Sequence, residues 1–249
     1  MARMRRLLLA LAVVAGACGG EPVPSPSASP ATTEPSSPSP DVSESPAASP
    51  VRPKGIPTTF EKGPPSGDLP LDQLVPPEAL ITGTWYVPAA GGIGEQVVIA
   101  YSSGEDPDPF ATDDGLVVWQ RFPERPAWRA VLGFFDAAPK GVLGIDVPAI
   151  GDVNGDGHDD LLTLESTGGS GACGVWRVLA TDPATGAMSE LFERSACDAG
   201  IALEGGRLTI EEAIYEPDDA HCCPSATRTT TMRWNGERWK VIGRETAPT

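Results

Sequence analysis

The chain has 249 residues, a net charge of -16 at pH 7, 28 glycines and 27 prolines. A chain this acidic repels nucleic acid and anionic lipid head groups, which excludes nucleic acid as a partner and leaves cations as acceptable ligands. Most prolines lie in the first third of the chain. Roughly the first 80 residues are therefore expected to form no packed core, and the rest suffices for a single domain.

The first 17 residues have the organisation of an export signal. Met1–Arg6 contain three arginines and no acidic residue, Leu7–Val14 form an unbroken apolar run, and Ala15–Ala17 are small. A basic segment, a short apolar run and small residues before a cleavage point are typical of a secretory signal peptide. The run is too short to anchor the chain across a bilayer. We therefore expect residues 1–17 to be removed.

The residues around the cleavage point, Ala15-Gly16-Ala17-Cys18, resemble the lipobox of bacterial lipoproteins. The resemblance implies that Cys18 becomes the new N-terminus and carries a diacylglycerol, with palmitate among its acyl chains. Ala15 departs from the more usual leucine, and an ordinary signal peptide beside a chance cysteine is the alternative. Because two or three acyl chains hold a protein firmly at a membrane, the resemblance implies a lipid anchor at the extracytoplasmic face of the cell membrane.

A linker is expected after the anchor, over residues 18–80. Residues 21–53 include ten prolines and nine serines and show no apolar periodicity. Pro-rich chains favour an extended conformation of about 3.1 Å per residue, so this stretch is expected to be a disordered stalk with a reach on the order of 100 Å. One short helical turn is expected around Leu71–Leu74.

Residues 81–246 are expected to form a single β-rich extracytoplasmic domain. Short runs of β-branched and aromatic residues alternate with Gly, Pro and Asp, which is typical of strands joined by turns. Asn235-Gly236 predicts a hairpin, since both residues tolerate positive φ. We predict an all-β fold of antiparallel strands, in the form of a sandwich, a barrel or a partial propeller. The expected strands are residues 96–101, 116–119, 128–132, 160–164, 175–179, 208–210, 229–234 and 238–242.

The six tryptophans fall on or beside these expected strands. Rows of exposed aromatic rings can bind sugars, but tryptophan more often fills a core. We expect a core role for most of them.

The most specific internal motif is the stretch 152–160, DVNGDGHDD, which has the form D-x-N-x-D-G-x-x-D. Calcium takes six to eight oxygen ligands at about 2.3–2.6 Å, and a tight loop with oxygen side chains at alternate positions can supply them. Asp152, Asn154 and Asp156 hold the first three such positions. The backbone carbonyl of His158 would hold the next, and Asp160 would close the shell.

This motif resembles the calcium loops of integrin-α FG-GAP repeats and related bacterial repeats, over residues 150–164. An EF-hand would need a glutamate at its twelfth position, where this chain has Thr163. The resemblance implies that the Asp and Asn side chains at positions 152, 154, 156 and 160 bind calcium and that a strand follows. One such loop occurs here, whereas a complete propeller would contain several. The alternative is an acidic turn without a metal.

The cysteines beyond the anchor are Cys173, Cys197, Cys222 and Cys223. An even number in an exported domain predicts two disulfides. A bond between the two adjacent cysteines would close a very small strained ring. We therefore expect Cys173 and Cys197 each to pair with one of the adjacent two. Zinc binding, with His221 nearby, is the alternative, and the export signal argues against it.

The stretch Asp218–Ser225, together with Arg233–Gly236, resembles actinobacterial lipoproteins of the LppP/LprE type. The likeness covers few residues. It implies a location in the envelope and no activity.

No residue pattern predicts an enzyme. The stretch 168–172, GGSGA, ends in alanine and leads into an expected strand, where a nucleophile elbow needs a helix. Gly92-Ile93-Gly94 lacks the third glycine of a dinucleotide loop. We therefore expect either a calcium-stabilised binding or adhesion module for a surface protein or glycan, or a structural or accessory envelope protein whose metal serves only the fold. A hydrolase is a distant third.

Overall fold

The computed structural model describes residues 59–61, 66–103, 113–122, 127–135, 144–168 and 173–249. The predicted signal peptide, Cys18 and the Pro/Ser-rich segment 21–53 lie outside the described residues and stay predictions. Within the described residues, no helix has the length and apolar character needed to span a membrane.

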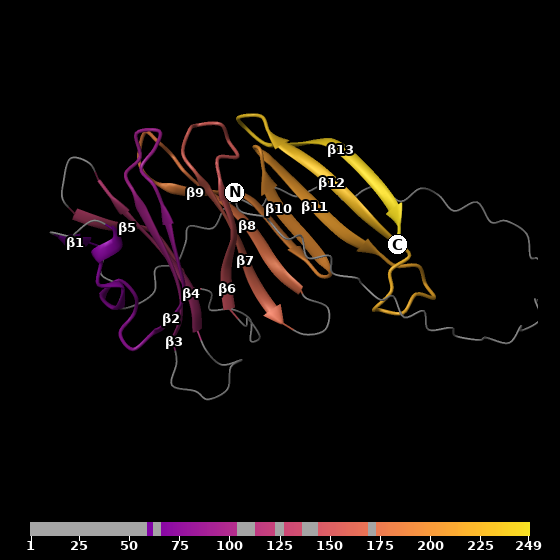
Figure 1. Ribbon diagram of the computed structural model, residues 1–249, viewed down its shortest axis with the longest axis horizontal. Coiled ribbons are helices and arrows are strands. Elements are labelled where there is room, and N and C mark those ends of the chain that lie inside the picture. The colour runs from indigo at the N-terminus through magenta and orange to yellow at the C-terminus, as the bar shows by residue number, and fades with distance from the viewer. Residues whose placement is uncertain (1–58, 62–65, 104–112, 123–126, 136–143, 169–172) are drawn as a thin grey trace, which may run out of the picture. The chain divides into compact units, whose positions relative to one another are not determined.

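Strands and two short 3-10 turns make up the regular structure of the described residues (Figure 1), which confirms the predicted all-β fold. The 3-10 turns are Ser66–Asp68 and Leu71–Gln73, and the second lies where a helical turn was predicted. The strands are β1 (Thr59–Glu61), β2 (Leu80–Val87), β3 (Gln96–Ser103), β4 (Asp113–Arg121), β5 (Ala127–Phe135), β6 (Gly144–Gly151), β7 (Asp160–Gly168), β8 (Cys173–Thr181), β9 (Met188–Ala196), β10 (Ala199–Glu204), β11 (Arg207–Ile214), β12 (Ala226–Trp234) and β13 (Trp239–Pro248).

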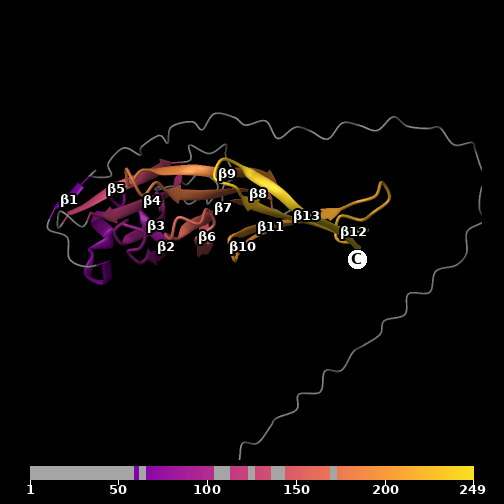
Figure 2. The same cartoon turned by 90° about the horizontal axis from the view of Figure 1, so that it is seen from above.

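These strands form three antiparallel sheets, with the orders β1-β5-β4-β3-β2, β6-β7-β8-β9 and β10-β11-β12-β13. Apart from β1, each sheet is a meander in which every strand pairs with the next along the chain. We call them the first, middle and third sheets. Figures 1 and 2 show them following one another in chain order.

The middle sheet has apolar side chains on both faces. Successive side chains of a strand point to opposite sides, so two adjacent apolar residues pack against different layers. Leu161 of β7 belongs to a buried cluster with Val98 of β3 and Leu116 of β4. Leu162, the next residue, belongs to a different cluster, which includes Leu208 and further residues of the third sheet. The first and third sheets therefore cover opposite faces of the middle sheet. This layered packing agrees with a sandwich-like architecture.

The outer face of the first sheet is covered by residues 66–79. Leu74 and Val75 are buried against Trp119 of β4 and Trp128 of β5, both of which are fully buried. The Trp119 indole N–H donates a hydrogen bond to the carbonyl oxygen of Leu74 at 2.9 Å. Segment 66–79 thus covers the apolar side chains on the outer face of the first sheet, which would otherwise be exposed to solvent.

The predicted domain boundaries need correction as a consequence. Residues 59–61 and 66–80 were expected in the linker, but β1 pairs with β5 and the segment after it packs on the first sheet. At the other end, β13 continues to Pro248, two residues beyond the expected limit of 246.

The hairpin predicted at Asn235-Gly236 is confirmed. Trp234 of β12 is paired with Trp239 of β13 across the turn. Gly236 has φ +97°, in the left-handed region that glycine favours. The side-chain oxygen of Asn235 accepts hydrogen bonds from the N–H groups of Glu237 and Arg238, which holds the turn closed.

We predict that Leu161→Ala lowers the free energy of unfolding by about 2–5 kcal/mol, because it leaves a cavity between the first and middle sheets. Leu80→Ala is the matched control, since Leu80 is 71% exposed. The control should change stability by less than about 0.5 kcal/mol. Chemical denaturation of the purified variants measures both, and equal effects would contradict the burial of this face.

Candidate functional site

The acidic loop connects β6 to β7, and its own side chains hold its backbone. The two carboxylate oxygens of Asp152 accept hydrogen bonds from the N–H of Gly155 at 2.6 Å and of Gly157 at 3.0 Å. Gly155 and Gly157 have φ values of +81° and +85°, which other residues adopt only with strain. The glycines of the motif therefore let the chain curl around Asp152.

The next two oxygen-bearing side chains continue this pattern. The Asn154 side-chain oxygen accepts the N–H of Asp156 at 2.8 Å, and a carboxylate oxygen of Asp156 accepts the N–H of His158 at 2.8 Å. The side-chain amide of Asn154 donates to the other oxygen of Asp156 at 2.9 Å. Side chains of this kind bond to backbone groups a few residues on and stabilise tight turns. The side chains of Asp152, Asn154 and Asp156 thus turn toward the backbone of their own loop.

Asp160 is the first residue of β7 and joins the end of the loop to its beginning. Its surface is 1% exposed. Its Oδ2 accepts the N–H groups of Val153 at 3.0 Å and Asn154 at 3.3 Å. Its Oδ1 is buried and has no hydrogen-bond partner among the described residues. Burial, together with the nearby carboxylates of Asp156 and Asp152, raises the pKa of Asp160 to about 7, although the two backbone hydrogen bonds oppose the shift. A proton or a cation would satisfy the unpaired Oδ1.

The His158 side chain fills the interior below the loop. It is 1% exposed, and its ring nitrogens have no hydrogen-bond partner among the described residues. Burial lowers the pKa of His158, although the carboxylates of Asp156 and Asp159 oppose the shift. The imidazole ring is thus packed in the interior, and the predicted ligand at this position is the backbone carbonyl.

The acidic loop lies against the corresponding turns of both neighbouring sheets. A Cβ on Gly91, between β2 and β3, would be 3.2 Å from the carbonyl oxygen of Asp156. A Cβ on Gly206, between β10 and β11, would be 3.8 Å from the carbonyl oxygen of Asp152. The Val153 side chain packs in the core shared by the middle and third sheets. The loop therefore lies where the three sheets meet.

The predicted ligand residues are thus gathered in one loop, but their oxygens are engaged by backbone N–H groups. Among the described residues, no group of three or more His, Cys, Asp or Glu side chains is arranged so that it could hold a metal ion. What the loop offers is a concentration of carboxylate charge, one side-chain amide and one unpaired buried oxygen.

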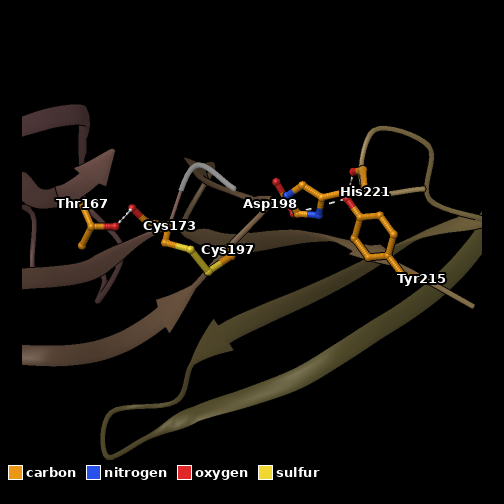
Figure 3. Close-up of a disulfide and its surroundings, with 6 residues drawn as sticks. All are labelled: Thr167, Cys173, Cys197, Asp198, Tyr215 and His221. Carbon is orange, nitrogen blue, oxygen red and sulfur yellow. Dashed lines mark hydrogen bonds and ion pairs between the residues drawn. A yellow bond between two sulfur atoms is a disulfide. The ribbon is translucent and has the colours of Figure 1, made fainter. Parts of the chain in front are cut away.

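The predicted disulfide pairing is wrong, because Cys173 and Cys197 are bonded to each other (Figure 3). Cys173 begins β8 and Cys197 directly follows β9. The two strands form a hairpin in which Gly174 lies opposite Ala196, so the cysteines face each other. The turn signal at residues 182–186 lies midway between them and could have indicated this register. Cys222 and Cys223 are free and exposed.

A polar cluster beside this disulfide was not predicted. Asp198 follows Cys197, and its carboxylate lies 3.2 Å from the Tyr215 hydroxyl and 3.7 Å from Nε2 of His221. The rings of Tyr215 and His221 are stacked with their centroids 5.7 Å apart (Figure 3). Asp198 therefore connects the disulfide to the loop that carries Cys222 and Cys223.

One small cavity, of about 120 Å³, opens beside the hairpin turn of β8 and β9. Its lining includes Ile93, Gln120, Phe122 and Thr185. Small-molecule sites usually occupy about 300–1,000 Å³, so this cavity gives little support for a bound metabolite.

Comparisons of the chain with known protein families, with curated proteins and with solved structures give no match. The acidic loop and the loop that carries Cys222 and Cys223 are the features of the molecule that bear on its function.

In the absence of a cation, we predict that the contribution of Asp160 to the free energy of unfolding falls as the pH rises from about 4 to about 7. The folded-state pKa of Asp160 is about 7 and its ordinary value is 3.8, so this carboxyl group binds more protons in the folded state in this interval. Its contribution to stability must then decrease with pH, by an amount on the order of a few kcal/mol. Asp160→Asn should remove this component, whereas Asp159→Asn should retain it. Chemical denaturation in EGTA across this pH range measures the difference, and identical slopes for the two variants would contradict the assignment.

Proposed function

We propose that the protein is an envelope lipoprotein, anchored through Cys18 at the extracytoplasmic face of the membrane, that presents its β domain as a calcium-stabilised binding or adhesion module. The observation that carries the calcium part is the buried, unpaired Oδ1 of Asp160, in a loop next to the turns of all three sheets. The sequence resemblances support the anchor.

The oxygen donors of the loop are of the kind that calcium prefers, although the described side chains are not arranged as a metal site. The carboxylates of Asp152, Asp156 and Asp160 repel one another, and a hard divalent cation with oxygen ligands turns that repulsion into attraction. Those three residues, with the Asn154 amide oxygen and the His158 carbonyl, would hold it. The cation would satisfy the buried oxygen of Asp160 without a proton. Its role here is to stabilise the fold, because the loop adjoins the turns of the first and third sheets.

Two exposed edges support a binding role. β2 and β13 each end a described sheet and have a neighbour on one side only. Leu80 and Tyr86 on β2, and Val241 and Ile242 on β13, have at least half of their surface exposed. An unpaired strand edge can accept an extended segment of a partner protein through backbone hydrogen bonds. A surface protein is therefore the partner that this geometry favours over a glycan.

A structural or accessory envelope protein is the second candidate, and it is favoured by the burial of aromatic residues. Trp119 and Trp128 are fully buried and Trp176 is 8% exposed, so these side chains form no sugar-binding row. Arrays of glycans and purified envelope proteins distinguish the two candidates. Saturable binding that V241D abolishes supports the module, and its absence supports the accessory protein.

We predict that calcium raises the melting temperature of the protein and that magnesium raises it less. Binding to the folded state alone adds about 2.7 kcal/mol at a hundredfold excess over Kd. Extracellular sites of this kind often bind at about 10⁻⁴–10⁻³ M, so millimolar calcium is the appropriate range. Thermal unfolding with calcium and with EGTA measures the increment.

Asp156→Ala should abolish the calcium increment, and Asp159→Ala is the matched control. Both remove one carboxylate from the same loop, but position 159 is not a ligand in the proposed set. The increment is compared within each variant, so any loss of basal stability cancels. An unchanged melting curve for the wild-type protein would leave the loop as an ordinary acidic turn.

For the anchor, we predict that Cys18→Ala abolishes lipidation, because the cleavage junction offers no other thiol. Metabolic labelling with a fatty-acid analogue in the producing bacterium should give a labelled wild-type protein and an unlabelled variant. Cys222→Ala controls for labelling of an exposed cysteine elsewhere and should keep the label. Equal labelling of wild type and Cys18→Ala would refute the lipoprotein assignment.

A further inference from the structure

Cys222 and Cys223 are adjacent in the chain, and both side chains are exposed. Their Sγ atoms are 2.8 Å apart, within hydrogen-bond distance. The pair belongs to the loop between β11 and β12. The other two cysteines of the domain are bonded to each other. Each of the adjacent thiols therefore has the other as its nearest partner for oxidation among the described residues.

The loop around the pair is held by its own polar groups. A carboxylate oxygen of Asp219 accepts hydrogen bonds from the N–H of Glu216 at 2.7 Å and from the N–H and hydroxyl of Ser225 at 2.9 and 2.7 Å. The N–H of Cys223 donates to the carbonyl oxygen of Ala220 at 2.8 Å. These bonds join the two ends of the loop and close a turn at Cys223, so the thiols are presented together at the surface.

A second set of contacts joins the loop to the disulfide. The Tyr215 hydroxyl lies 2.8 Å from the carbonyl oxygen of His221, the residue before the pair. The same hydroxyl and the His221 ring lie close to Asp198, which follows Cys197 (Figure 3). The exposed thiols are thus positioned by contacts at both sides of the loop.

The two thiols also interact electrostatically. A hydrogen bond between the Cys223 thiol and the Cys222 sulfur holds Cys223 in its protonated form and raises its pKa, and the charge of Cys222 adds to the effect. The Cys223 thiol is therefore more resistant to proton loss than a free cysteine.

We propose that Cys222 and Cys223 are a redox-active dithiol that undergoes thiol–disulfide exchange with small disulfides. One thiolate attacks a disulfide RSSR, forms a mixed disulfide and releases RS⁻, which takes up a proton. The neighbouring thiolate then attacks the protein sulfur of the mixed disulfide and releases the second RS⁻. The net reaction oxidises the two cysteine thiols to a vicinal disulfide and reduces RSSR to two RSH. This activity goes beyond the proposed function and depends on neither calcium nor the anchor.

The vicinal bond should be the more easily reduced of the two disulfides. It closes a very small ring, and strained disulfides have the more oxidising potentials. The Cys173–Cys197 bond joins two neighbouring strands across a hairpin. Mixtures of reduced and oxidised glutathione can therefore separate the two pairs.

The experiment equilibrates the full chain in glutathione mixtures from strongly oxidising to strongly reducing, blocks free thiols with a maleimide and maps tryptic peptides by mass spectrometry. Trypsin places Cys222 and Cys223 together in peptide 208–228, Cys173 in peptide 141–177 and Cys197 in peptide 195–207. We expect peptide 208–228 to lose both maleimide labels in oxidising mixtures and to carry both in reducing ones. Peptides 141–177 and 195–207 should stay linked at ratios that open the vicinal pair.

Cys222→Ser and Cys223→Ser trap the intermediate. With one thiol left, peptide 208–228 should carry one bound glutathione in oxidising mixtures, and that adduct should be absent from the wild type. The Cys side chains at these positions are exposed, and circular dichroism confirms that the variants fold. The proposal is overturned if the wild-type peptide keeps both labels at every ratio, accumulates bound glutathione, or links to Cys173, Cys197 or a second copy of the chain.

Discussion

Leu161 and Leu162 follow one another on β7, and both are fully buried, on opposite faces of the middle sheet. Burying a leucine side chain stabilises a fold by about 1.5–3 kcal/mol, so exposure of either face of this sheet to solvent would be unfavourable. One face requires the first sheet and the other requires the third. The layered order of the domain follows from this requirement, and so does the covering segment 66–79, because the first sheet in turn carries Trp119 and Trp128 on its far face.

The acidic loop owes its properties to the same strand. Asp160 directly precedes Leu161, so a buried carboxylate lies next to the apolar core between the first and middle sheets. Burial there raises the pKa of Asp160, and the inward-turned side chains of Asp152 and Asp156 add negative charge nearby. The turns at Gly91 and Gly206 meet the loop from either side, so any group that neutralises this charge acts where all three sheets adjoin.

The sequence predicted the inner strands well and the edge strands poorly. Strands such as β3, β4, β7 and β8 have neighbours on both sides and carry apolar runs. The strands without a prediction, β1, β2, β6, β9 and β10, all lie at sheet edges. There a proline such as Pro148 of β6 is tolerated, and it interrupts the alternating pattern that marks a strand. The loop at 152–160 was identified because its spacing is local, whereas the Cys173–Cys197 bond required the β8–β9 register. The cluster around Asp198 depends on tertiary contacts that no local pattern encodes.

The meander order has a consequence for how the chain folds. Apart from β1 with β5, every strand pairs with its neighbour in the sequence, so little loop-closure entropy is lost in forming each sheet. A chain made from its N-terminus can thus complete the first sheet early and lay β6–β9 against it. The face of the middle sheet that carries Leu162 then stays exposed to solvent until residues 199–248, which form the third sheet, have been synthesised. Premature termination in that interval would leave a half-covered sheet with an apolar face, which is the species most prone to self-association.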